Sequence, residues 1–273
     1  MPAAYAHYRF GKDVLECLPS IYRKPVETYR ELYDIGLHGP DILFYYKPLS
    51  SNPVNQTGYQ MHDEPALLFF ERAASLIKES GNPEALKAYL FGFICHFSLD
   101  SACHPYIEKM TSTSGLSHSE IETELDRFLM EKDGLKPTVY IPVEHIHATK
   151  EISETIAPCF EERTPQEIRS SLKGMILCHK LLQSQNSKWR KFLYLALKVT
   201  GNYNSMHGMV MEPEADERCR ESCLRLNQLY TESVTVAVSL IQQYFRKLEQ
   251  GAPLSSRFDV TFGAGEHWQD ILL

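Results

Sequence analysis

The stretch FGFICHFSLDSACHP, residues 91–105, decides how this chain is interpreted. His96, Asp100 and His104 stand four residues apart in it. On a helix each such step turns the chain by about 40° past a full turn, so the three side chains project from one side. Just upstream, Asn82-Pro83 predicts a helix start with a capping side chain followed by a first-turn proline. Pro105 disfavours helical geometry at the preceding residue, so we expect this helix to end or kink at His104.

The polar stripe lies in apolar surroundings. Phe93, Ile94 and Phe97 flank His96 and predict a largely buried helix. Burying two imidazoles and a carboxylate without partners is costly, and one metal ion would satisfy all three. Nitrogen and oxygen ligands of these kinds suit zinc. A core or surface stripe that happens to hold two histidines is the alternative interpretation.

A second polar pair follows 14 residues after His104. His118 and Glu122 are again four apart, and Ser117-His118-Ser119-Glu120 has the form of a capping box that starts a helix. Asp126 continues the same face and could support a ligand by a hydrogen bond. We therefore expect two helices to present ligands to one place.

The rest of the chain also favours helices. Strand-like runs are few: residues 138–143 contain Pro142, and 258–265 could be a strand or a tail. We expect an all-α fold, with a single multi-helix domain over residues 1–250 and a C-terminal tail over 251–273. The further helical stretches are 25–38, opened by Pro25 and closed by Gly39; 63–80; one that begins at the capping box Thr164–Glu167; and 214–249, which stops at Gly251.

Composition narrows the class of protein. The 273 residues are 43% hydrophobic, enough for one sizeable core or two small ones. The net charge of −7 argues against nucleic acid and anionic membrane surfaces as bulk partners. No apolar run of transmembrane length occurs, and the first twenty residues lack the apolar stretch of a secretion signal. The seven cysteines form no CxxC pair, so we expect reduced thiols and a cytoplasmic protein.

Three upstream residues gain meaning from the central segments. His7, Asp41 and His62 precede them, giving the order His, Asp, His, His-x3-Asp, His, His-x3-Glu. This order resembles the zinc-dependent phospholipase C family, the all-helical enzymes typified by bacterial phosphatidylcholine-hydrolysing phospholipase C and the catalytic domain of clostridial alpha-toxin. By motif the resemblance covers about residues 1–130.

The resemblance implies a cluster of two or three zinc ions and hydrolysis of a phosphate ester by metal-activated water. It also implies that Asp41 acts as a general base, and that the substrate is a phospholipid or a soluble phosphate ester. The implied ligands are Asp41, His62, His96 and Asp100 for one zinc, His104, His118 and Glu122 for a second, and His7, Asp100 and the amino terminus for a third.

Two other functions remain open. A metal phosphohydrolase of the HD class would use His38, the pair His62-Asp63, and Asp100 or Asp126. A zinc-binding protein without turnover would keep the ligands and lack a substrate pocket. The aromatic run Phe44–Tyr46 could cradle a quaternary ammonium group, although we favour ordinary core and rim aromatics there.

Overall fold

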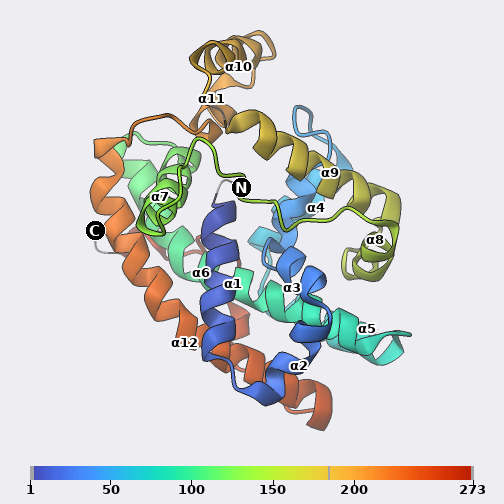
Figure 1. Ribbon diagram of the computed structural model, residues 1–273. Coiled ribbons are helices and arrows are strands. Elements are labelled where there is room, and N and C mark those ends of the chain that lie inside the picture. The colour runs from blue at the N-terminus through green and yellow to red at the C-terminus, as the bar shows by residue number, and fades with distance from the viewer. Residues whose placement is uncertain (1–2, 184, 272–273) are drawn as a thin grey trace.

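Helix α6 (Pro83–Ser114) passes through the middle of the molecule in the computed structural model, which describes residues 3–183 and 185–271 (Figure 1). It begins as predicted, with the Asn82 side chain accepting a hydrogen bond from the Ala85 N–H. It does not end at His104. The helix continues through Pro105 to Ser114, because buried Tyr106 and Ile107 carry its apolar contacts past the proline.

Helices from distant parts of the chain surround α6. Glycines allow the closest approach, since a Cβ on Gly36 would lie 2.1 Å from the Tyr89 carbonyl oxygen, and one on Gly92 would lie 2.1 Å from that of Tyr33. This crossing brings the end of α3 beside the centre of α6. The packed helices are α1 (Ala4–Cys17), α2 (Ser20–Thr28), α3 (Arg30–Gly36), α5 (Ala66–Glu79) and α12 (Arg220–Gln250).

The predicted helix 25–38 is wrong in its start and its continuity. Pro25 lies inside α2, and the chain breaks at Tyr29, which has φ −123° and ψ 50°. The break turns α3 so that Gly36 can pack on α6. Close packing of two helices thus outweighs the local signal of a first-turn proline.

The remaining elements cover the ends of this bundle. The capping boxes predicted at Ser117 and Thr164 are both confirmed. These elements are η1 (Gly39–Tyr45), α4 (Pro53–Asp63), α7 (His118–Lys132), α8 (Lys150–Ile156), η2 (Ala157–Cys159), α9 (Pro165–Leu182), α10 (Ser187–Val199), α11 (Tyr203–Met206), η3 (His207–Met209), η4 (Glu217–Cys219), η5 (Ser256–Asp259) and η6 (Trp268–Asp270).

The predicted all-α class is confirmed. Across the described residues the only β-type pairing is one isolated antiparallel bridge, between Pro65 and Thr261. Neither 138–143 nor 258–265 forms a strand. Within the same part of the chain, none of the helices has the length and apolar character needed to cross a bilayer.

The segment after α12 returns to the core. Phe258 and Phe262 are fully buried and pack on Phe97 of α6, with ring centroids 5.7 and 5.0 Å away. The division into a domain over 1–250 and a tail over 251–273 stays a prediction. The packing of these two rings nevertheless places residues of the segment directly behind the polar stripe of α6.

Candidate metal centre

The structure brings the eight predicted ligand residues to one place, although they come from five elements. They are His7 on α1, Asp41 on η1, His62 on α4, His96, Asp100 and His104 on α6, and His118 and Glu122 on α7.

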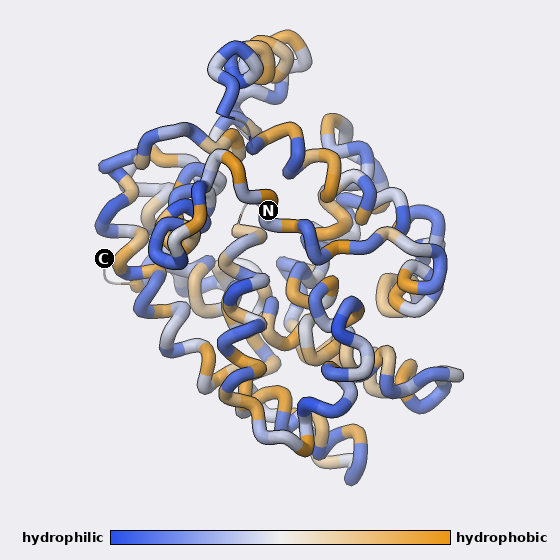
Figure 2. The backbone as a smooth tube through the Cα atoms, viewed as in Figure 1, coloured by the Kyte–Doolittle hydropathy of each residue, from blue (hydrophilic) through white to orange (hydrophobic). Residues whose placement is uncertain are grey.

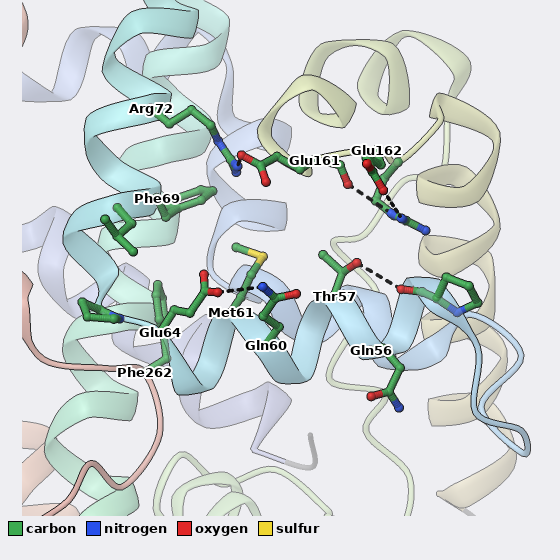
Figure 3. A pocket seen from close by; sticks show the side chains of 14 residues that line it. Gln56, Thr57, Gln60, Met61, Glu64, Phe69, Arg72, Glu161, Glu162 and Phe262 are labelled. Carbon is green, nitrogen blue, oxygen red and sulfur yellow. Dashed lines mark hydrogen bonds and ion pairs between the residues drawn. The ribbon is translucent and has the colours of Figure 1, made fainter.

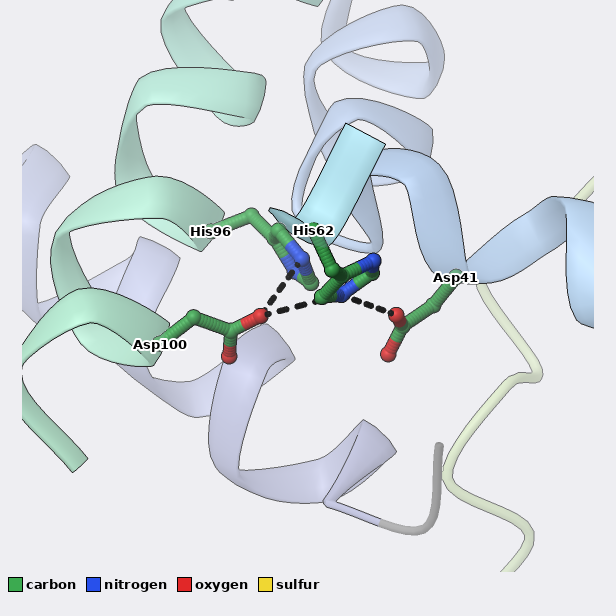
Figure 4. Close-up of side chains that lie close together, drawn as sticks. All are labelled: Asp41, His62, His96 and Asp100. Atoms are coloured by element: carbon green, nitrogen blue, oxygen red, sulfur yellow. Dashed lines mark ion pairs between the residues drawn. The ribbon is translucent and has the colours of Figure 1, made fainter. Parts of the chain in front are cut away.

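Two carboxylates and two imidazoles form the first group, drawn in Figure 4. One ligand atom from each of Asp41, His62, His96 and Asp100 can be chosen so that all four lie within 4.8 Å of one another. His62 Nε2 is 3.2 Å from Asp41 Oδ1, and His96 Nε2 is 2.9 Å from Asp100 Oδ2. Four side chains with nitrogen and oxygen donors match the number and type of ligand that zinc takes.

Asp100 connects this group to its neighbours. Its Oδ1 lies 3.1 Å from His7 Nε2 and 3.8 Å from His104 Nε2. Burial acts to raise the pKa of the Asp100 carboxyl, but His96, His104 and His7 hold it well below its usual range. The central carboxylate is therefore charged. The amino terminus, which the resemblance adds to His7 and Asp100 as a ligand, lies outside the described residues.

The second group consists of His104, His118 and Glu122, whose ligand atoms also lie within 4.8 Å of one another. Glu122 Oε1 is 3.6 Å from His104 Nε2 and 3.3 Å from His118 Nε2. The Glu122 side chain is 3% exposed and that of His118 is 39% exposed. This group therefore has a buried side and a side that opens to solvent.

The contact between His96 and Asp100 tests whether a cation fits. His96 Nε2 and Asp100 Oδ2 are buried and 2.9 Å apart, yet neither atom has a hydrogen-bond partner of acceptable geometry in the described chain. Buried polar atoms of this kind are expected to have a partner. A cation held by both atoms would supply it, so the residues present fit zinc.

Backbone carbonyls fix the orientation of three of the imidazoles. The Nδ1 of His62 lies 2.8 Å from the Gly58 oxygen, that of His96 lies 3.3 Å from the Leu37 oxygen, and that of His104 lies 2.7 Å from the Phe262 oxygen. A carbonyl only accepts, so each Nδ1 donates and the proton resides there. In the neutral ring this leaves the Nε2 lone pair directed at the ligand groups, as in many zinc sites.

Asp126 has a different role from the predicted one. Among the described residues it makes no hydrogen bond to a ligand side chain, and its carboxylate instead accepts hydrogen bonds from the backbone N–H groups of Tyr5 and Ala6. Burial raises the pKa of Asp126 to about 7, although both bonds act to lower it. Asp126 thus holds the first turn of α1, from which His7 projects.

A cavity of about 560 Å³ adjoins both groups and is walled by several residues that the sequence did not indicate. Phe44 lines it, whereas Tyr45 is buried and bonds His179 through its hydroxyl, so the aromatic run divides between cavity and core. No ligand-like spacing in the sequence marks these added wall residues, and only the folded structure shows that they line the cavity. They are Tyr59, Asn204, Ser205, Met209, Gly263 and Ala264.

A larger cavity, of about 700 Å³, lies on the other side of α4 and holds neither metal group (Figure 3). Ion pairs between Arg72 and Glu161 and between Arg163 and Glu162 border it. Its floor includes Phe262, whose carbonyl bonds His104. The larger cavity therefore contacts the back of the metal centre, and size alone does not identify the reactive cavity.

Of the residues of the HD-class alternative, His62 and Asp100 lie together in the first group, but His38 and Asp63 do not join them. His38 Nε2 instead lies 2.8 Å from His145 Nε2, a partly buried contact that the sequence did not predict. Asp63 is exposed, and neither His38 nor Asp63 belongs to either metal group found in the described part of the chain.

Comparison with known proteins agrees with the geometry. The family described as zinc dependent phospholipase C matches residues 6–174, more than half of the chain and the part that carries all eight residues. No curated protein and no solved structure gives a significant match. On the strength of that match, the chain belongs to the zinc-dependent phospholipase C family.

Proposed function

We propose that this chain hydrolyses phosphate esters, with phospholipase C-like cleavage of a phosphodiester as the principal reaction and two or three zinc ions per chain. The observation that carries the proposal is the adjacency of two ligand groups, with Asp100 Oδ1 of one 3.8 Å from His104 Nε2 of the other, beside a cavity of about 560 Å³. Groups so close can act on the same substrate phosphate.

The metal-binding side chains have different roles in the proposed reaction. When bound, zinc polarises a phosphoryl oxygen and makes water a stronger acid. Asp41 is the candidate base: burial acts to raise its pKa, but the neighbouring imidazoles, including His62, lower it, so the carboxylate is ionised. The lower pKa also makes it a weaker base, so it would accept a proton only from a water that bound zinc has made more acidic. Asp100 stays ionised between the imidazoles and holds them in place.

The cavity wall suggests how a phospholipid headgroup is held. The rings of Phe44 and Tyr59 lie 4.6 Å apart, and Phe44 is 5.4 Å from the His62 ring. Aromatic faces attract quaternary ammonium groups. A choline headgroup could therefore lie against this wall with its phosphate at the metal centre, and a soluble phosphate ester would use the same centre without the wall.

The experiment combines metal analysis with turnover. The chain is purified without chelator or metal-affinity tag, zinc per chain is measured by plasma mass spectrometry, and hydrolysis of phosphatidylcholine and of a soluble phosphodiester is followed. Glu122→Ala and His118→Ala should each lose zinc and activity, whereas His147→Ala, at an exposed histidine, should lose neither. Full activity in both ligand variants would refute the proposal, and bound zinc without hydrolysis would favour a non-catalytic zinc protein.

A further inference from the structure

Helix α10 presents an apolar face to solvent. Phe192, Leu195 and Val199 are 55, 60 and 79% exposed. At about 100° per residue they lie within about 60° of one another around the helix. Figure 1 shows α10 at the edge of the molecule, and in Figure 2 its apolar segments are visible on this outlying helix.

The opposite face of α10 is already occupied. Leu197 packs with Leu182, Met209 and Val210 in a small apolar cluster separate from the main core. Arg190, on the same side, pairs with Glu212 at 3.3 Å. The exposed face is therefore not needed to hold the helix on the protein, and its apolar residues are unexplained by folding.

The exposed face extends onto the end of α9. The Trp189 indole N–H donates to the Leu181 oxygen at 2.9 Å, and the Trp189 ring stacks on Phe192 with centroids 5.3 Å apart. Leu177 and Leu181 on α9 are 57 and 36% exposed. We call this the α9–α10 surface, made of Leu177, Leu181, Trp189, Phe192, Leu195 and Val199.

The stretch of chain that carries this surface has a net charge opposite to that of the whole chain. Residues 168–211 contain no aspartate or glutamate, while the whole chain has a net charge of −7. All the basic residues of this stretch except Arg190 are exposed. The exposed ones are Arg169, Lys173, Lys180, Lys188, Lys191 and Lys198.

We infer that the α9–α10 surface binds the surface of an anionic phospholipid membrane. Interfacial helices combine a Trp, Phe and Leu face with flanking lysines. Lysine is depleted in protein–protein interfaces, and exposed leucine and valine add nothing to nucleic-acid binding, so the combination favours lipid. The inference goes beyond the proposed hydrolysis and needs no turnover.

The surface is joined to the reactive cavity by a short connection. Residues 200–202 link α10 to α11, whose Asn204 and Ser205 line the cavity beside His104 and His118. A membrane bound at α10 is therefore close in the chain to one wall of the metal centre. Docking there would supply lipid substrate locally if the proposed function holds.

The test uses the full chain and vesicles of phosphatidylcholine, with or without phosphatidylserine, and measures binding by flotation. We expect binding to the phosphatidylserine vesicles that weakens with salt. Phe192→Ser with Leu195→Ser should weaken it about tenfold or more, and Lys188→Gln with Lys191→Gln by roughly fivefold for each lysine. In a Trp268→Phe background, Trp189 fluorescence should shift to shorter wavelength on binding.

Matched variants change equally exposed residues elsewhere, namely Ile21→Ser with Leu224→Ser, and Lys24→Gln with Lys78→Gln. These should bind like the unaltered chain. Absence of vesicle binding would overturn the inference, as would equal losses in the matched variants. Self-association abolished by the Phe192→Ser and Leu195→Ser changes, without vesicle binding, would show that the surface meets a second copy of the chain and would also overturn it. Hydrolysis is assayed separately, so vesicle binding without product supports this inference while refuting the proposed reaction.

Discussion

The part of the chain that matches the family and the part beyond it contribute to the metal centre in different ways. Residues 6–174 supply all eight candidate ligand side chains. Beyond residue 174, the described chain adds no side chain to either metal group. It supplies the Phe262 carbonyl to His104, the Gly263 N–H to the His62 oxygen, and part of the cavity wall. Ligand side chains can be recognised from their spacing in the sequence, whereas backbone groups that support them have no sequence pattern.

The largest effect is expected from Asp100→Asn, in the part of the chain that matches the family (residues 6–174). Asp100 lies within 3.1 Å of His7 and 2.9 Å of His96, and it also borders His104 of the second group. Removing its charge should release at least one zinc per chain and lower kcat/KM by roughly 10³-fold or more. Metal analysis and phosphodiester hydrolysis measure both.

Asp63→Asn is the matched control, because Asp63 is an exposed carboxylate that lines the same cavity and, in the described chain, belongs to neither metal group. It should keep its zinc and lose less than about threefold in activity. If Asp100→Asn behaved like this control, Asp100 would not be the link between the two groups.

Phe262→Ala tests what the chain beyond residue 174 contributes to the metal centre. Loss of this buried ring should lower the free energy of unfolding by about 3–5 kcal/mol. Without the ring, the backbone at residue 262 should shift, so that its carbonyl no longer orients His104. Loss of a hydrogen bond that orients a metal ligand lowers metal affinity by about 10- to 100-fold. Chemical denaturation and zinc titration against a competing chelator give the two quantities.

Phe258→Ala separates these effects. Phe258 is buried in the same segment and packs on the same Phe97 ring, and in the described chain it makes no hydrogen bond to a candidate ligand. It should lose similar stability and keep its zinc affinity. Equal zinc affinities in the two variants would show that the Phe262 carbonyl does not support His104 as a ligand.

Much of the fold and the candidate site could be predicted from the sequence for a physical reason. The four-residue spacing of His96, Asp100 and His104 survives any arrangement of the other helices, because it depends only on helix geometry. The capping boxes at Ser117 and Thr164 are equally local. The break at Tyr29 and the carbonyl of Phe262 depend on which helices meet, and no local pattern encodes that.

The distribution of charge over the surface also depends on the fold and cannot be predicted from the net charge. The net charge of −7 argues against anionic membranes as partners, but it is an average over 273 residues. The stretch 168–211 has no acidic residue, and the fold exposes its lysines beside apolar side chains. A sum over the chain hides such a local reversal. The location of charge on the folded surface is therefore the better guide to partners.

His145 offers a smaller, pH-dependent test within the first part. Burial lowers the pKa of His145 to about 3 and that of His38 well below its usual range. In the unfolded chain each takes up a proton near its ordinary pKa of about 6.5. The contribution of these two histidines to the free energy of unfolding should therefore be complete above pH 6.5. It should be lost progressively as the pH drops from there toward 3. The charged and aromatic neighbours of His145 are Tyr8, Arg30, His38, His147 and His179.

His145→Phe keeps a ring against Tyr8 and removes one of these protonations. Between pH 7.5 and 5.5 its loss of stability should be smaller than that of the unaltered chain by about 1 kcal/mol. Urea denaturation at the two pH values measures the difference. Since loss of zinc affects both proteins alike, an identical pH dependence would mean that His145 titrates normally in the folded chain.

The smallest effect compares the two walls of the cavity. Tyr59→Leu removes an aromatic face supplied by the first part, and Asn204→Ala trims a side chain supplied by the second. An exposed cation–π contact contributes about 0.5–1 kcal/mol, so Tyr59→Leu should raise KM for a choline-headed phospholipid by about two- to fivefold and leave kcat unchanged. KM for a phosphodiester without a cationic group should not move, and Asn204→Ala should change neither KM. Equal effects of Tyr59→Leu on both substrates would mean that the ring only shapes the cavity, and the headgroup would then have to be recognised from the wall beyond residue 174.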